Sequence, residues 1–191
     1  MANNILAVQL GADTLSLAIA QASLRSSRIQ LLASLERGSP SIADLVASRA
    51  WDCVIAALPA EAAAFRVLEF PFHDRRRLGQ AVGPALEAHV PFSLDDSLVG
   101  WDYLESDRRG AVLAVMVARE ALAAHRDHLE SLGIRPQRWV WQPSATLEVY
   151  RRAAASGSFT AIDLGADGAV VACFVDGKLQ GLRTSARAAR V

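Results

Sequence analysis

AVQLGADTLSLAIA (residues 7–20) returns late in the chain as AIDLGADGAVVACF (residues 161–174). The two stretches align without a gap, and both are typical of an apolar strand, a tight Gly-Ala-Asp turn and a second apolar strand. Glycine gives such a turn its backbone freedom, and aspartate favours turns by accepting hydrogen bonds from nearby backbone N–H groups. Because the match extends into the flanking strands, we predict a duplicated fold in which two equivalent hairpins face a common cleft. Two unrelated hairpins with similar turns are the alternative.

The composition is that of a globular chain. Of the 191 residues, 52% are hydrophobic and 21% are charged, and the formal net charge is zero. A neutral chain creates no overall field for nucleic acid, so no nucleic-acid partner is expected. No signal peptide is evident, and no apolar stretch approaches the ~20 residues that cross a bilayer, so membrane association would come through a partner or through sequence absent from this chain. Cys53 and Cys173 lie in apolar runs and are predicted to be buried, reduced thiols.

The first half of the chain is predicted to form a layered α/β domain. Residues 28–36 are typical of a third strand beside the first hairpin, and a helix follows from Ser41. Residues 52–58 (DCVIAAL) form a continuous apolar run that ends at Pro59. A run without alternation is typical of a strand buried on both faces, as in a parallel sheet. Strands, helix and buried strand in this order predict helices packed on a mixed sheet.

A second unit with a different pattern follows. Asp74 is suited to cap a helix, and we expect a kink or break in that helix near Gly83, because an internal proline such as Pro84 costs ~3 kcal/mol. The predicted strands of this unit are residues 65–70, 97–106 and 110–118, and its predicted helix is residues 75–90.

The remaining elements lead into the second copy of the repeat. We predict a helix, a strand, a helix and a last strand, at residues 119–132, 134–141, 144–155 and 178–183. The first copy continues into a helix and a buried strand, whereas the second copy reaches its third strand and stops. We therefore expect a chain that is truncated within the second half of a duplicated fold.

This order of elements resembles the actin-like ATPases, in which two glycine-containing hairpins face each other across a nucleotide cleft. The middle of the chain is more specifically similar to two related families: the cytoplasmic part of the type II secretion system L proteins (GspL) and the type IV pilus assembly M proteins (PilM). The stretches that carry this likeness are AALP (56–59), FRVLEFP (65–71), LEAHVPF (86–92), WDY (101–103) and VMVARE (115–120). Each stretch alone is a weak signal, and the likeness rests on the order and spacing of all five.

The resemblance implies an actin-like (ribonuclease H-like) layered fold with an inserted α/β subdomain. The implied segments are 1–60 and 119–160 for domain I, 61–118 for the inserted subdomain and 161–191 for the start of domain II. The resemblance also implies a scaffold at the cytoplasmic face of the bacterial inner membrane. Its partners would be the secretion ATPase (GspE-like) and other platform proteins (GspM-like), and a homodimer is compatible with that role.

The same resemblance identifies candidate nucleotide-binding residues at the two turns. They are Gly11, Asp13, Thr14, Asp163, Gly165 and Asp167. Phosphoryl transfer in this fold needs Mg²⁺ and phosphate cradles on both sides of the cleft. Gln9 stands where the second copy has Asp163, and an amide is a poorer Mg²⁺ ligand than a carboxylate. We therefore expect no catalytic residue, no metal and no resident cofactor. In this interpretation, Asp13 and Asp167 are turn residues that cap local N–H groups.

Two further groups of side chains carry charge or could bind a metal. Arg75, Arg76 and Arg77 lie in a predicted first helical turn, where cations oppose the helix macrodipole. The fold would gain nothing from that placement, so we expect them to meet an acidic surface of the secretion ATPase or anionic lipid headgroups; a solvated basic face is the alternative. His125 and His128 are three residues apart but have no third metal ligand nearby, and are interpreted as a core-edge and a solvated histidine.

The sequence thus predicts a non-catalytic adaptor in a type II secretion platform. The first alternative is a PilM-like protein that binds ATP with Mg²⁺ and clasps the N-terminal peptide of a membrane partner. The second is a fragment of an actin-like sugar or acetate kinase, which would require an acid where Gln9 stands.

Overall fold

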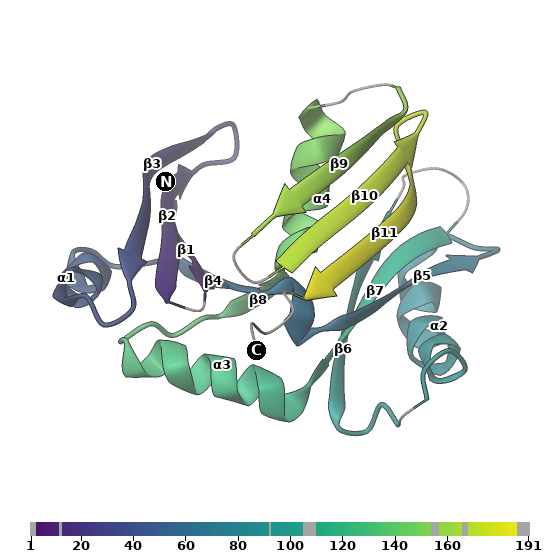
Figure 1. Ribbon diagram of the computed structural model, residues 1–191, viewed down its shortest axis with the longest axis horizontal. Coiled ribbons are helices and arrows are strands. Elements are labelled where there is room, and N and C mark those ends of the chain that lie inside the picture. Colours follow the sequence, from purple (N-terminus) through teal and green to yellow (C-terminus); the bar gives the residue numbers. More distant parts are fainter. Residues whose placement is uncertain are drawn as a thin grey trace.

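A computed structural model describes residues 3–11, 13–91, 93–104, 110–153, 157–165 and 168–186. Its largest sheet has five strands in the order β3-β2-β1-β4-β8 (Figure 1). These strands are β1 (Asn3–Leu10), β2 (Thr14–Ala22), β3 (Ser27–Glu36), β4 (Cys53–Leu58) and β8 (Arg138–Trp141). β4 is parallel to both β1 and β8, as its unbroken apolar run predicted. The predicted burial on both faces was wrong, because the face that carries Cys53 is only half-buried.

Helices α1 (Pro40–Ala47) and α3 (Arg119–Ser131) cover one face of this sheet. Ile42 of α1 and Leu129 of α3 are almost fully buried against the alternate residues of β1 and β2 that point to the same face. Gly133 follows α3 with a positive φ of 78°, which ends the helix as expected of a C-terminal glycine. Among the described residues, no helix is both long and apolar enough to cross a membrane.

A three-stranded antiparallel sheet lies between β4 and α3 in the sequence. It has the order β5-β7-β6, and the short helix η1 (Ala60–Ala62) leads into it. Its strands are β5 (Ala64–Phe70), β6 (Ser97–Tyr103) and β7 (Gly110–Ala118). Helix α2 (Arg75–Glu87) packs on one face of this sheet through Leu78, Val82 and Leu86, which are all essentially buried.

Helix α2 is continuous from Arg75 to Glu87, so the break expected near Gly83 is absent. It runs through Gly83 and continues past Pro84, which lies on an exposed position inside it. Each of the three buried aliphatic side chains contributes about 1.5–3 kcal/mol. Together they outweigh the cost of one internal proline. The helix begins where predicted, because the Asp74 carboxylate accepts a hydrogen bond of 2.9 Å from the Arg77 N–H.

A second three-stranded sheet closes the described chain. Its order is β11-β10-β9, and α4 (Gln142–Ala153) precedes it. The strands are β9 (Phe159–Leu164), β10 (Gly168–Val175) and β11 (Lys178–Ala186). Figure 1 shows α4 behind this sheet, where Leu147 joins a core with Trp141 of β8 and Phe174 of β10. Cys173 is exposed, contrary to the prediction, because it points to the other face of β10.

The two hairpins are equivalent in register, which confirms that part of the prediction from the repeat. Ala7 pairs with Ala18 in the first hairpin, and Ala161 pairs with Ala172 in the second, at positions 154 residues later. At both turns the glycine N–H donates a 2.8 Å hydrogen bond to the carbonyl three residues on, from Gly11 to Thr14 and from Gly165 to Gly168.

The equivalence extends to an irregularity that sequence comparison alone does not reveal. The pairing of β2 with β3 shifts between Ile19 and Ala20. The pairing of β10 with β11 shifts between Cys173 and Phe174, again 154 residues later. Both sheets therefore contain the same hairpin, the same added third strand and a bulge at the same point.

The two copies nevertheless bury opposite faces. In β2 the buried residues are Leu15, Leu17 and Ile19, whose counterparts in β10 are only half-buried or exposed. In β10 the buried residues are Val170, Ala172 and Phe174, whose counterparts in β2 are half-buried or exposed. The same backbone thus serves two packing environments, and the side chains at each face differ accordingly.

This inversion predicts unequal effects for one substitution at matched sites. Ala172→Leu should destabilise the protein by about 1–3 kcal/mol, because Ala172 is fully buried and extra methyl groups overpack its core. Ala18→Leu, at the equivalent position on a half-buried face, should change stability by less than about 0.5 kcal/mol. Urea unfolding of both variants measures the difference, and equal losses would contradict the inverted burial.

Candidate functional site

Three parallel strands end at one edge of the large sheet. β1 leads to the Gly11 turn, β4 leads to Pro59, and β8 leads directly into Gln142 at the start of α4. Because the carboxyl ends of parallel strands lie at the same edge, these three positions come together. Such an edge is where ligands of open α/β sheets usually bind.

A pocket of about 430 Å³ opens beside the first turn at this edge. The turn contributes Gly11, the end of β3 contributes Arg37, and η1 contributes Glu61. Helix α3 supplies the opposite wall through His125 and His128. The pocket is therefore lined by one guanidinium, one carboxylate and two imidazoles.

Arg37 and His128 contact each other inside this pocket. The Arg37 Nη2 atom lies 2.8 Å from Nε2 and 3.2 Å from Nδ1 of His128. A guanidinium can only donate, so the imidazole must accept through an unprotonated nitrogen. Burial lowers the pKa of His128, and the positive charges of Arg37 and then His125 lower it further. The interpretation of His128 as merely solvated was wrong, because only the fold brings Arg37 to α3.

The second hairpin meets the same sheet edge through α4. The Gln142 Nε2 atom donates a 2.9 Å hydrogen bond to the Asp163 carboxylate and lies 3.1 Å from the Thr146 hydroxyl. Burial raises the pKa of Tyr150, and the nearby charge of Asp163 raises it further. The Asp163 carboxylate thus accepts a hydrogen bond from the Gln142 side chain and lies near the Tyr150 phenol.

The sequence-predicted turn residues fall into two groups. Gly11 lies in the pocket with Arg37, while Asp13 and Thr14 are exposed and use their backbone carbonyls to accept from Arg37 and Gly11. Asp163 lies with Gln142 and is not among the residues that line the pocket. The remaining candidates are Gly165, which is exposed at its turn, and Asp167, which lies outside the described residues.

Arg37 and Gln142 were not among the residues predicted from the sequence. Each directly follows a strand end at this edge, and that position was the available signal. Gln9 was correctly noted as the counterpart of Asp163, and its side chain lies on the opposite, open face of the sheet beside Ser16 and Ala57. Among the described residues, no three His, Cys, Asp or Glu side chains are grouped closely enough to hold a metal ion.

The arginine triplet divides into two parts. The guanidinium carbon of Arg75 lies 5.0 Å from the ring centroid of Trp101 and 6.0 Å from that of Tyr103, so this cation packs on two aromatic faces of β6. The expectation that the fold gains nothing from the triplet was therefore wrong for Arg75. Arg76 and Arg77 are exposed and line a shallow hollow together with Asp74.

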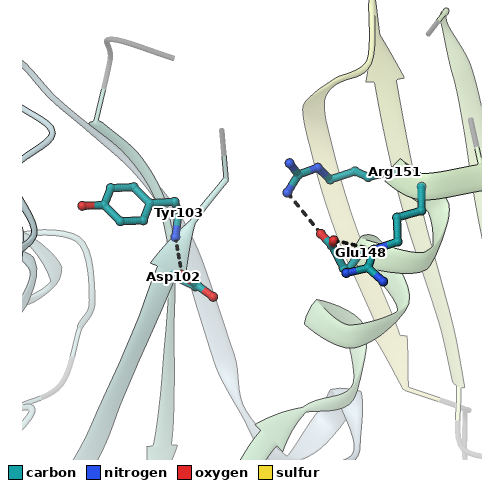
Figure 2. A network of polar contacts seen from close by, with 5 residues as sticks. Asp102, Tyr103, Glu148 and Arg151 are labelled. Carbon is teal, nitrogen blue, oxygen red and sulfur yellow. Dashed lines mark hydrogen bonds and ion pairs between the residues drawn. The ribbon is translucent and has the colours of Figure 1, made fainter. Parts of the chain in front are cut away.

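A second pocket, of about 490 Å³, lies between β6, α4 and the last two strands. Its apolar lining includes Leu113, Leu147 and Phe174. Figure 2 shows Asp102 on β6 opposite the charged side chains of α4. There Glu148 accepts from both Arg152 at 2.9 Å and Arg151 at 3.4 Å. The pocket thus combines an apolar lining with charges of both signs.

Comparison with solved structures finds proteins that share this fold, among them the following three. A PilM–PilN type IV pilus biogenesis complex matches with a TM-score of 0.74 at 19% identity, over 94% of this chain and 60% of that chain. A Bacteroides thetaiotaomicron protein with an actin-like ATPase fold and unknown function matches with a TM-score of 0.59 at 12% identity, over 97% and 70%. The cytoplasmic domain of EpsL, an inner-membrane component of the type II secretion system of Vibrio cholerae, matches with a TM-score of 0.57 at 18% identity, over 96% and 71%.

These similarities show that the chain has the actin-like fold, as the sequence predicted. It spans about 60% of the length of the matching chain in the pilus complex. No family model and no curated protein matches the sequence.

The Arg37–His128 contact predicts a pH dependence. Folding lowers the pKa of His128, so at slightly acidic pH this imidazole is protonated in the unfolded chain more than in the folded protein. The contribution of this site to stability is therefore present above the ordinary histidine pKa of 6.5 and is lost as the pH falls below it. His128→Gln keeps an acceptor for Arg37 but cannot be protonated. Urea unfolding between pH of about 7.5 and 5.5 should show a smaller loss of stability in the variant. Identical losses would contradict the assignment.

Proposed function

We propose that the protein is a non-catalytic adaptor that uses an actin-like fold to hold partners. The proposed setting is the cytoplasmic face of the bacterial inner membrane, within the platform of a type II secretion system. There it would recruit the secretion ATPase and contact further platform proteins. The fold shared with the cytoplasmic domain of EpsL supports this setting.

The observation that carries the non-catalytic role is the state of Asp163. Metal-assisted phosphoryl transfer needs carboxylates that are free to bind Mg²⁺ or its waters. One oxygen of the Asp163 carboxylate already accepts a hydrogen bond from Gln142, and the counterpart of Asp163 in the first hairpin is the amide of Gln9. The hydrogen bond on Asp163 and the amide at position 9 both favour a structural role for this region over nucleotide hydrolysis.

A specific observation also favours the pilus-type alternative. The pocket between β6, α4 and the last strands has an apolar lining and charges of both signs at its rim. A short peptide with apolar side chains and a charged terminus would fit those features. The matching pilus structure is a complex of PilM with PilN, which supports a membrane-protein partner in either setting.

The non-catalytic role predicts weak or absent nucleotide binding. Calorimetric titration of the protein with Mg-ATP should give no saturable heat in the micromolar range. Gln142→Ala releases the Asp163 carboxylate from its hydrogen bond and should not by itself create Mg²⁺ binding, because Gln9 lies on the open face of the sheet and supplies no second carboxylate. Micromolar Mg-ATP binding by the wild type would overturn the non-catalytic assignment and favour the pilus-type alternative.

The adaptor role also predicts a contribution from the exposed pair of arginines. Arg76→Glu with Arg77→Glu should weaken association with the acidic partner surface by roughly tenfold and reduce its salt sensitivity. Arg25→Glu, an exposed arginine in another part of the chain, is the matched control. Binding of the secretion ATPase to immobilised protein at two salt concentrations measures the effect. If Arg25→Glu weakened binding of the ATPase as much as the double variant, or if the double variant bound it normally, Arg76 and Arg77 would have no specific role in the interface.

A further inference from the structure

The pocket beside the Gly11 turn is separate from the carboxylate of Asp163. It is bounded by the end of β3, by η1 and by α3, and its lining includes neither Asp163 nor Gln9. Gln9 points to the other, open face of the large sheet. The charged side chains of this pocket therefore need an explanation of their own.

One wall of the pocket is cationic. Arg37 follows the end of β3, and its Nη2 atom lies 2.8 Å from Nε2 of His128 on α3. Burial lowers the pKa of His128, and the positive charges of Arg37 and then His125 lower it further. The electrostatic potential on this wall is therefore positive. A guanidinium with several N–H donors suits a carboxylate, which can accept two of them at once.

A carboxylate lies on the other side of the pocket. Glu61 belongs to η1, which follows β4. β2 and β1 lie between β3 and β4 in the sheet, so Arg37 and Glu61 begin on opposite sides of the Gly11 turn. Glu61 forms no ion pair with another described residue, and its charge is not among those that act on the pKa of His128. The pocket therefore keeps its positive and negative charges apart.

The lining between the two charged walls is apolar. Leu10, Pro59 and Ala124 contribute to it, and the Gly11 turn adds no side chain. The volume of about 430 Å³ lies within the range of pockets that hold small organic molecules. These features suit a compact ligand that has charges of both signs and an apolar part.

We propose that this pocket binds a free α-amino acid with an apolar side chain. The carboxylate of the ligand accepts from Arg37, its ammonium group donates to Glu61, and its side chain packs on the apolar lining. A simple anion would place a like charge beside Glu61, and a simple cation would do the same beside Arg37. The site is independent of the proposed adaptor role, since it uses neither the hydrogen bond on Asp163 nor the arginine pair of α2.

A ligand series tests the two charges separately. L-leucine, titrated to its solubility limit, should give saturable shifts of the Gly11, Ala124 and His128 amides in two-dimensional NMR spectra. The titration is made at a pH of about 6.5, where the amine of leucinamide is protonated. N-acetyl-leucine lacks the ammonium group and leucinamide lacks the carboxylate, so each should bind about tenfold more weakly than L-leucine. No saturable shift with L-leucine, or an analogue that binds as tightly, would overturn the proposal.

Paired substitutions assign each charge to its residue. Glu61→Gln should weaken binding of L-leucine and leucinamide by about tenfold but not that of N-acetyl-leucine, because only the first two carry an ammonium group. Arg37→Gln should weaken binding of L-leucine and N-acetyl-leucine and leave that of leucinamide unchanged.

Glu36→Gln and Arg28→Gln are the matched controls, because both residues are exposed on β3 and neither lines the pocket. Well-dispersed amide signals in the same spectra check that each variant is folded. Equal losses for all three ligands in either pocket variant, or losses of the same size in the controls, would overturn the proposal.

Discussion

The hydrogen bond between the Gln142 amide and the Asp163 carboxylate joins the two halves of the duplicated fold. Gln142 stands where β8 ends and α4 begins, and Asp163 lies one residue before the end of β9. A hydrogen bond to a carboxylate is about twice as strong as one between neutral groups. It also uses the acidic side chain that an actin-like ATPase would need for metal chemistry.

Duplication explains the shape of both sheets, and packing explains why their sequences diverged. The hairpins agree in register, turn hydrogen bond and bulge, yet β2 buries the residues whose counterparts face outward in β10. Gln9 and Asp163 illustrate the consequence. The second lies beside α4 and has a partner there, whereas the first points to the open face, where an amide suffices.

Local patterns in the sequence were enough to predict the hairpins, the parallel strand β4, the Asp74 cap and the glycine that ends α3, because each depends on neighbours along the chain. Helix α2 was mispredicted because three buried side chains outweigh Pro84, and burial is a tertiary effect. The contact of Arg37 with His128 joins residues 91 positions apart, and that of Gln142 with Asp163 depends on where two sheets meet. The repeated turns predicted Gly11 and Asp163, whereas their neighbours Arg37 and Gln142 became evident only in the fold.

A double-mutant cycle on Gln142 and Asp163 tests the central claim most directly. The free energies of unfolding of the wild type, Gln142→Ala, Asp163→Ala and the double variant give the coupling between the two side chains. If this bond joins the halves of the molecule, the coupling should be about 1 kcal/mol or more in favour of the intact pair. Losses that add to within about 0.3 kcal/mol would show that the two side chains do not interact, and would contradict the account.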